Sequence, residues 1–245
     1  MGPGQDPGAG IRPLRALSVG RGGPLVLLHG YAMQPWTYLG LARVLGREAR
    51  VVIPAIFSLE GRWTFDRALD ALVATLDELG LERVSLLGHS FGGGLELGLA
   101  ARYPERVVEC VFADTLGVKA RFGLAREALH DPLGILAMAT PRAAASFFQS
   151  VVTHPGQLAA AAMWGFLSDR DPDIEAVVAA GIPCHVLWAN RDTLLARSDG
   201  QEFARRLGAS FTVAVDPPVD HDWMFDDPGL FAAHLRLLGL EVLGG

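Results

Sequence analysis

The pentapeptide Gly88-His89-Ser90-Phe91-Gly92 follows the apolar run 84–87 and precedes a helix-like stretch that ends at Arg102. A serine at so sharp a turn needs strained backbone dihedral angles, and the positions two residues to either side must be almost free of side-chain atoms. The turn lifts the hydroxyl clear of the sheet and directs the N-terminus of the next helix toward it. The pattern predicts a strand-to-helix turn that presents Ser90 as a nucleophile. The alternative is a glycine-rich turn around an ordinary serine.

The length and composition are typical of one compact domain with a large core, or of a core domain that carries an insertion. Of the 245 residues, 50% are hydrophobic and 20% are charged. The net charge of −6 argues against nucleic acid as a partner, because phosphate binding needs a clustered basic surface. No stretch of about 18 uninterrupted apolar residues is present, so no membrane span is expected.

The N-terminus and the cysteines indicate the compartment. Residues 1–10 have neither the basic nor the apolar region of a secretory signal, and we expect a disordered tail there. Cys110 and Cys184 lie in apolar, strand-like runs, which favours buried, unreactive thiols over a disulfide framework or a metal site. The expected location is the cytoplasm, and a homodimer is compatible with the sequence.

Short apolar runs alternate with helical periodicity along most of the chain, which predicts a mostly parallel sheet with helices on both faces. The expected strands are Leu14–Val19, Pro24–Leu28, Arg50–Pro54, Val84–Leu87, Val107–Ala113, Cys184–Ala189 and Phe211–Val215. The expected helices are Trp36–Gly46, Phe65–Leu79, Phe91–Arg102, Asp199–Leu207 and Pro228–Leu238.

One interval, residues 116–180, breaks this alternation. It is Ala-rich and helical, is divided by four prolines, and is far longer than a crossover connection requires. We therefore expect a helical lid at 116–180, inserted into a core domain formed by residues 11–115 and 181–245. Its large apolar residues include three candidates for lining a substrate pocket, although packing on the core is the simpler interpretation for any one of them. The three are Trp164, Phe147 and Met138.

The order of three polar residues resembles that of the α/β-hydrolase family. Ser90 lies in the sharp turn, Asp192 follows the run 186–189, and His221 lies beyond the run that ends at residue 215. This family uses the same order of nucleophile, acid and base. The resemblance covers nearly the whole chain and implies an α/β fold, with a doubly wound, mostly parallel sheet of about seven to eight strands and an inserted helical cap.

The resemblance implies a catalytic triad. Neutral His221 would remove the proton of Ser90, and Asp192 would orient the ring and stabilise the imidazolium. Activity would then fall on acidification with an apparent pKa of about 6 to 7. Asp114, after the run 107–113, is the alternative acid, because some family members use an acid there. A turn or a helix cap is its other interpretation.

The remaining histidines are expected to be structural or to lie at the surface. The side chain of His89, inside the pentapeptide, is expected to point away from the serine. No pattern of partner residues surrounds the others, which are His130, His154, His185 and His234.

The stretch Leu27-Leu28-His29-Gly30-Tyr31 resembles the family's His-Gly-x turn after an early strand. An oxyanion hole needs two backbone N–H groups that point at the developing negative charge. The resemblance implies that Tyr31 supplies one of them and that Phe91, at the start of a helix, supplies the other. Gly30 would allow the close approach, and His29 would brace the loop.

Two departures from the family weaken any inference about the substrate. The sheet lacks one of the two strands that the family often has before the strand leading to His29. Residues 55–61 replace the family's Asp-x-x-Gly-x-Gly-like loop, which helps to wall the pocket.

The predicted function is that of a serine hydrolase that cleaves an ester, thioester or lactone of a small to medium apolar acyl compound. Carbon–carbon bond hydrolysis or cofactor-free perhydrolysis by the same triad is the alternative, as is a non-catalytic ligand-binding homologue. The serine nucleophile argues against the haloalkane dehalogenase and epoxide hydrolase branches. No cluster of residues has metal-ligand spacing. We therefore expect a small-molecule substrate as partner, and neither a metal nor a cofactor.

Overall fold

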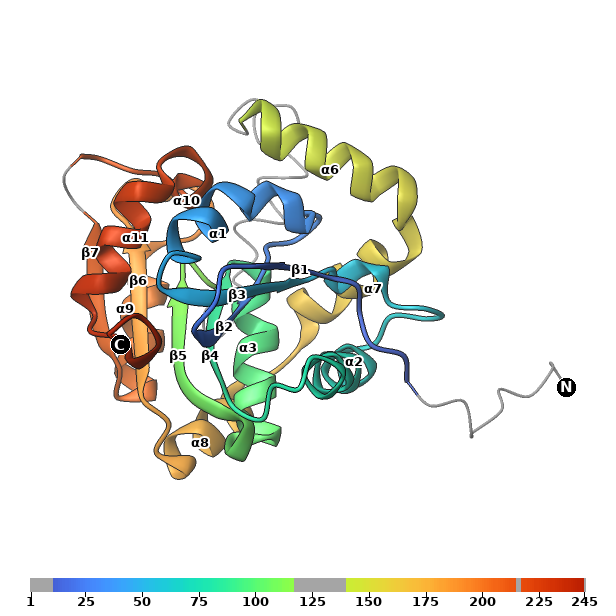
Figure 1. Cartoon of the computed structure of the whole chain (residues 1–245), viewed down its shortest axis with the longest axis horizontal. Helices are drawn as coiled ribbons and strands as arrows, with labels where there is room; N and C mark the ends of the chain where they lie inside the picture. The colour runs from blue at the N-terminus through green and yellow to red at the C-terminus, as the bar shows by residue number, and fades with distance from the viewer. Residues whose placement is uncertain (1–10, 117–139, 215–216, 245) are drawn as a thin grey trace, which may run out of the picture.

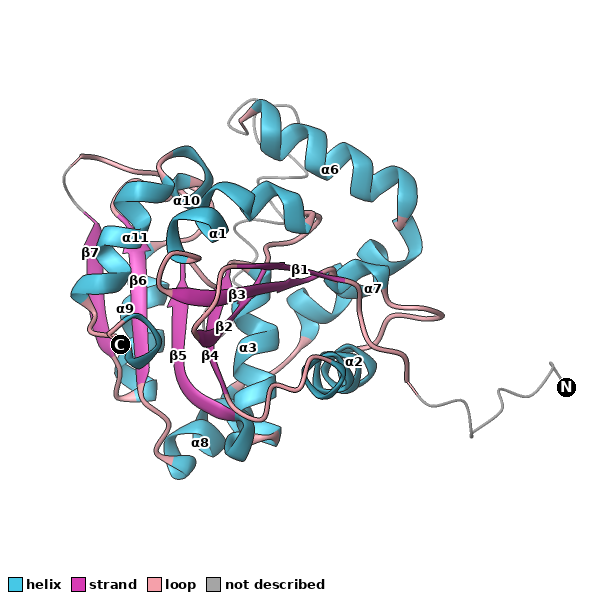
Figure 2. Ribbon diagram, viewed as in Figure 1, coloured by secondary structure: helices cyan, strands magenta, loops and turns pink. Residues whose placement is uncertain are grey.

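Seven strands form one sheet in the computed structural model, which describes residues 11–116, 140–214 and 217–244 (Figures 1 and 2). Their order is β1-β3-β2-β4-β5-β6-β7, with β1 antiparallel to β3 and every other pair parallel. This is the mostly parallel sheet that the sequence predicts. The strands are β1 (Ala16–Val19), β2 (Gly23–Leu28), β3 (Ala49–Pro54), β4 (Val84–His89), β5 (Val107–Ala113), β6 (Cys184–Ala189) and β7 (Ser210–Ala214).

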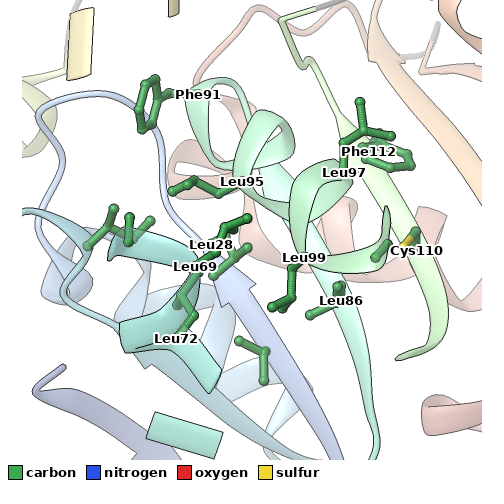
Figure 3. Close-up of a cluster of buried hydrophobic side chains, with 14 of the residues drawn as sticks. Leu28, Leu69, Leu72, Leu86, Phe91, Leu95, Leu97, Leu99, Cys110 and Phe112 are labelled. Carbon is green, nitrogen blue, oxygen red and sulfur yellow. The ribbon is translucent and has the colours of Figure 1, made fainter. Parts of the chain in front are cut away.

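Helices cover both faces of the sheet because its central strands are apolar on both sides. Along β2, Val26 and Leu28 belong to one buried cluster, whereas Leu25 and Leu27 belong to the other. Figure 3 shows part of the first cluster, between the strands and α2 and α3. That cluster includes residues of α2 (Phe65–Glu78), α3 (Phe91–Arg102), α8 (Asp171–Ala180) and α9 (Arg197–Leu207). The second includes residues of α1 (Leu39–Leu45), α10 (Trp223–Asp226) and α11 (Pro228–Leu237).

The helix expected at residues 36–46 is divided in the structure. Pro35–Tyr38 form a 3-10 turn, and α1 begins only at Leu39. The helix α10 has four residues, which is too short for any hydrophobic periodicity to reveal it in the sequence. Both segments lie close to the serine turn, because the rings of Tyr38 and Phe225 each contact the ring of His89.

Two further helices, α6 (Pro141–Thr153) and α7 (Pro155–Leu167), fall within the predicted lid (Figure 1). Each begins with a proline, whose fixed φ angle and missing N–H suit the first helical position. Polar contacts attach α6 to the loop after β2: Ser146 Oγ accepts hydrogen bonds from Gln34 N and Thr37 Oγ1, both at 2.7 Å. The predicted tail at residues 1–10, and Met138, lie outside the described residues.

No helix in the described part of the chain combines the length and the apolar character needed to cross a membrane.

Candidate active site

Ser90 occupies a strained turn between β4 and α3, with φ 53° and ψ −117°. The flanking glycines make this turn feasible. A Cβ atom at Gly92 would collide with the carbonyl oxygen of Leu28, and one at Gly88 would collide with the carboxyl of Glu96. The close-packed turn therefore exposes the Ser90 side chain at the carboxyl edge of the sheet, where ligands bind in folds of this class.

Backbone strain is concentrated around this turn. Among the described residues, three that are not glycine have positive φ angles: Ala32 (58°), Ser90 (53°) and Asp114 (43°). They follow β2, β4 and β5 respectively, so they share one edge of the sheet. Strain of this kind persists only where surrounding contacts enforce it, and it is common at functional sites.

His221 and Asp192 form a buried pair at the same edge. Nδ1 of His221 lies 2.8 Å from Oδ2 of Asp192, and their side chains are 10% and 1% exposed. Oδ1 of Asp192 accepts hydrogen bonds from the backbone N–H groups of Leu194 and Leu195, both at 2.8 Å. A carboxylate only accepts, so the bond requires a proton on Nδ1 of His221, and Nε2 is the nitrogen available as a base.

The structure brings Ser90 next to this pair through its neighbour in the chain. The rings of His89 and His221 lie 4.8 Å apart between centroids, and Nε2 of His89 is 3.1 Å from the carbonyl oxygen of His221. The hydrogen bonds of the described residues include none between the Ser90 hydroxyl and His221. In ligand-free enzymes, this bond is often long and shortens only when substrate is bound.

Three carboxyl groups surround His221. Burial alone disfavours the charged ring, but the charges of Asp192, Asp114 and Asp222 outweigh it and raise the pKa of His221 to about 9. Burial raises the pKa of Asp114 to about 7 and that of Asp222 to about 6. The imidazolium form of His221 is therefore strongly stabilised at this position.

Asp114, the alternative acid, has different partners. Its Oδ1 accepts a hydrogen bond from Ala189 N at 2.6 Å, and its Oδ2 accepts one from Trp223 Nε1 at 2.8 Å. The fully buried carboxyl thus links the ends of β5 and β6 to α10. This role goes beyond the local turn or cap that the sequence suggested, and neither of these two hydrogen bonds reaches His221.

The His29-Gly30-Tyr31 turn has a fixed orientation. Nε2 of His29 accepts the N–H of Ile56 at 3.1 Å, so the ring proton is on Nδ1, which donates to the carbonyl oxygen of Gly30 at 3.0 Å. The N–H of Met33 donates to the same oxygen at 3.1 Å. Since a trans peptide holds its N–H opposite its C=O, these two bonds also fix the direction of the Tyr31 N–H.

The second candidate donor, the N–H of Phe91, is the first of α3. The first N–H groups of a helix have no acceptor within the helix and carry its positive dipole end. The side chains of the two residues are in contact, because the rings of Tyr31 and Phe91 are 5.9 Å apart between centroids. A Cβ atom at Gly30 would lie only 3.5 Å from that of Ser90, so the turn borders the serine directly.

Two of the three predicted pocket residues, Trp164 and Phe147, lie against the core. Trp164 stacks on Phe65 at 4.3 Å with an interplanar angle of 12°, and it meets the edge of Phe91 at 5.5 Å. Phe147 is half-buried and packs against the first core cluster. Two further rings, Phe57 and Trp63, contact Phe91 at 5.7 and 5.9 Å.

Neither Phe57 nor Trp63 is predicted from the sequence as a pocket residue. Both belong to the segment between β3 and α2, where the family's pocket loop would lie. Phe57 lies within residues 55–61, where the sequence departs from the family's loop, and Trp63 follows that stretch by two residues, so this departure was the signal available in the sequence. Together with Tyr31, Phe91 and Trp164 they form an aromatic cluster beside the serine turn, and we call these five residues the aromatic cluster.

One group of residues could in principle hold a metal ion in the described ranges. The ligand atoms of His89, His221 and Asp222 lie within 4.8 Å of one another. However, both ring nitrogens of His89 are engaged in hydrogen bonds, with Tyr38 Oη and with the carbonyl of His221. The ring nitrogen that donates to the carbonyl carries a proton and cannot bind a metal, so this donor set fits a metal poorly.

The other histidines have local partners. His185 contacts Ser210, His234 contacts the carbonyl of Leu230, and His154 contacts Thr153. His130 lies outside the described residues.

Comparisons with known proteins point to one family. The family model described as "Alpha/beta hydrolase family" matches residues 25–234. A putative non-heme haloperoxidase of Mycobacterium phage D29 is 28% identical over 92% of this chain and 90% of its own length. A 2-hydroxymuconate semialdehyde hydrolase of Pseudomonas sp. (strain CF600) is 34% identical over 40% of this chain and 38% of its own length.

Solved structures share the fold. A thermophilic esterase from Thermogutta terrifontis superposes with a TM-score of 0.76 at 21% identity, over 94% of each chain. An enol-lactonase from Burkholderia xenovorans LB400 superposes with a TM-score of 0.73 at 17% identity, over 93% of this chain and 96% of its own.

Proposed function

Because this chain belongs to the α/β-hydrolase family, we propose that it is a serine hydrolase that cleaves an ester, thioester or lactone of a small to medium apolar acyl compound. The observation that carries this proposal is the buried pair of His221 and Asp192, 2.8 Å apart, beside a strained Ser90. A protein that only binds a ligand has no need of an imidazole whose tautomer is fixed so that its basic nitrogen is free.

In the proposed mechanism, Oγ of Ser90 attacks the carbonyl carbon of the substrate while Nε2 of His221 takes the hydroxyl proton. The tetrahedral oxyanion collapses, the bond to the leaving alcohol, thiol or alkoxide breaks, and His221 returns the proton to that group. Water then repeats the sequence on the acyl-enzyme and releases the acid. Asp192 holds the ring and stabilises the imidazolium in both steps.

The N–H groups of Tyr31 and Phe91 are proposed to bind the oxyanion. Support comes from the two hydrogen bonds that fix the Gly30 carbonyl and from the position of Phe91 at the start of α3. Fixed donors of this kind stabilise charge that develops only in the transition state, and they need no reorganisation during the reaction. The aromatic cluster beside Ser90 favours an apolar acyl group over a charged one.

A second candidate function keeps the same residues. The relative from Pseudomonas is by its name a hydrolase of 2-hydroxymuconate semialdehyde, and the phage relative is by its name a haloperoxidase. Carbon–carbon bond hydrolysis of a ketone-type substrate and cofactor-free perhydrolysis are therefore the alternatives to ester cleavage.

A fluorophosphonate probe and a series of p-nitrophenyl esters of increasing acyl length test the proposal together. We expect the wild type to be labelled on Ser90 and to hydrolyse short and medium esters, and Ser90→Ala to lose both properties while keeping its circular dichroism spectrum. Wild-type protein that resists the probe would contradict an activated serine. Labelling without ester turnover would favour the carbon–carbon hydrolase, and peracid formation from ester and hydrogen peroxide that exceeds hydrolysis would favour the perhydrolase.

A further inference from the structure

A chain of hydrogen bonds joins the three loops of the candidate site. The hydroxyl of Tyr38, which is fully buried, accepts the N–H of Gly30 at 2.8 Å and lies 2.7 Å from Nδ1 of His89. On the other side of that ring, Nε2 lies 3.1 Å from the carbonyl oxygen of His221. The chain therefore begins at Gly30, in the turn proposed to bind the oxyanion, passes through His89, which precedes Ser90, and ends at the backbone of His221, the proposed base.

Only one arrangement of protons satisfies this chain. The Gly30 N–H can only donate and the His221 carbonyl can only accept, so Nε2 of His89 must carry the ring proton. Nδ1 of His89 is then an acceptor, and it takes the hydroxyl proton of Tyr38. Burial, together with the nearby His221, holds the pKa of His89 well below the usual value, which keeps the ring neutral and the direction of every bond fixed.

Packing leaves these side chains little freedom. The ring of Phe225 meets both Tyr38 and His89 edge-on, at 4.8 and 5.7 Å between centroids. A Cβ atom at Gly30 would lie 3.2 Å from Nδ1 of His89 and 3.3 Å from the Tyr38 hydroxyl, so any side chain at this position would be crowded against both groups. Hydrogen bonds within a buried, fully satisfied network are strong and directional.

We propose that Tyr38 and His89 are positioning residues, which keep the oxyanion-binding turn and the loop of His221 aligned with Ser90. Neither side chain would touch the substrate. Tyr38 holds the peptide that precedes Gly30, and His89 holds the backbone of His221, so the loss of either bond misaligns groups that act in the transition state. This inference rests on the proposed hydrolase function.

A positioning role differs from a structural one in its kinetic signature. Groups that stabilise only the transition state change kcat when they are misplaced, whereas substrate binding, measured by KM, changes little. A purely structural role would lower thermal stability and reduce the amount of active enzyme without altering the behaviour of the molecules that remain folded.

The experiment compares Tyr38→Phe with Tyr103→Phe. Each substitution removes one tyrosine hydroxyl. Tyr103, however, follows the far end of α3, about 18 Å along the helix from Ser90, and its hydroxyl donates to Asp70. With the best p-nitrophenyl ester and active sites titrated by a fluorophosphonate, we expect kcat of Tyr38→Phe to fall about 10- to 100-fold with KM nearly unchanged. Tyr103→Phe should keep the wild-type kcat.

His89→Gln provides an independent measurement, since glutamine can still donate to the His221 carbonyl but cannot bridge to Tyr38 in the same geometry. In the double variant with Tyr38→Phe, we expect the losses in kcat not to multiply, because both changes break one chain of bonds. Equal kcat values for wild type and Tyr38→Phe, or losses that multiply in the double variant, would overturn the inference while leaving the hydrolase function intact. A wild type without ester hydrolysis would instead overturn the proposed function, and with it the premise of this inference.

Discussion

The hydroxyl of Tyr31 donates a hydrogen bond to the carbonyl oxygen of Leu158, 3.0 Å away and 127 residues later in the chain. The same residue supplies the N–H that we propose to bind the oxyanion, and Leu158 lies in α7, within the predicted lid. Tyr31 therefore connects α7 directly to the turn beside Ser90.

The substitution Tyr31→Phe should loosen this link and spare the chemistry. The phenylalanine ring keeps the contacts with Phe57 and Phe91, and the backbone N–H is unchanged, so we expect kcat for the smallest ester to remain within about threefold of wild type. Hydrogen exchange in α7 should become faster, because one of its bonds to the core is lost.

A matched comparison is Gln157→Ala, which removes three other bonds between α7 and the core, to Leu59 O, Gly61 O and Trp63 N. It should accelerate exchange in α7 more than Tyr31→Phe does. Unchanged exchange in Tyr31→Phe would show that the hydroxyl does not hold α7 against the core.

The pH dependence of kcat/KM should reflect the carboxyl groups around His221. The ring must be neutral to accept the Ser90 proton, and its pKa is raised to about 9, so activity should fall as the pH decreases below that value. The apparent pKa of this loss of activity should therefore lie above the range of about 6 to 7 that the ordinary histidine pKa suggests. Asp222→Asn removes one of the charges that raise this pKa, and it should move the loss of activity to lower pH.

The profile is measured from about pH 6 to about pH 10, with chemistry shown to be rate-limiting. An acid limb at the ordinary histidine value in the wild type, unmoved by Asp222→Asn, would contradict this account of the environment of His221.

The sequence predicts the sheet and the order of the site residues because these depend on local patterns. The serine turn needs glycines at fixed positions, and the apolar runs that precede Asp192 and His221 place both loops at the carboxyl edge. The pairing of Asp192 with His221 is the geometry that this order implies.

What the sequence does not predict depends on side-chain directions between distant residues. Tyr38 and His89 are 51 residues apart, and nothing local marks them as partners. The two bonds of Asp114 likewise reach residues 75 and 109 positions away. The 3-10 turn that divides the helix expected at 36–46 ends at Tyr38, the partner of His89.

His29 should make folding stability depend on pH. Burial lowers its pKa to about 4, whereas the unfolded chain has the ordinary value of 6.5. Below pH 6.5, His29 binds a proton in the unfolded state but not in the folded state. The free energy of unfolding therefore decreases as the pH is lowered from 6.5 to about 4, by roughly 3 kcal/mol at most.

The test is urea unfolding of the wild type and of His29→Asn between about pH 7 and pH 4. The variant loses the acceptor for Ile56 N and should be less stable at neutral pH, but the difference from wild type should narrow as the pH falls. His185→Asn changes a histidine that is bonded to Ser210 near the surface, and its free energy of unfolding should depend on pH as that of the wild type does. A gap that stays constant with pH would contradict a neutral, buried His29.

The choice between Asp192 and Asp114 as the acid is tested by two matched substitutions. In Asp192→Asn, the amide oxygen can still accept from Leu194 and Leu195, so its NH₂ group faces Nδ1 of His221 and forces the ring proton onto Nε2. The base then lacks its free nitrogen, and kcat should fall by as much as about 10⁴.

Asp114→Asn should affect stability more than chemistry. The carboxyl oxygens of Asp114 accept from two donors, Ala189 N and Trp223 Nε1. The amide of asparagine has one oxygen and can accept from only one of them, and its NH₂ group, itself a donor, faces the other. Leaving one buried donor unpaired costs about 1–3 kcal/mol, while Asp192 still orients His221, so kcat should fall far less than in Asp192→Asn. Both variants are compared by thermal unfolding, circular dichroism and kcat on one ester. If Asp114→Asn is folded and loses more activity than Asp192→Asn, the acid follows β5 rather than β6, and the 2.8 Å contact with His221 is not the one that supports catalysis.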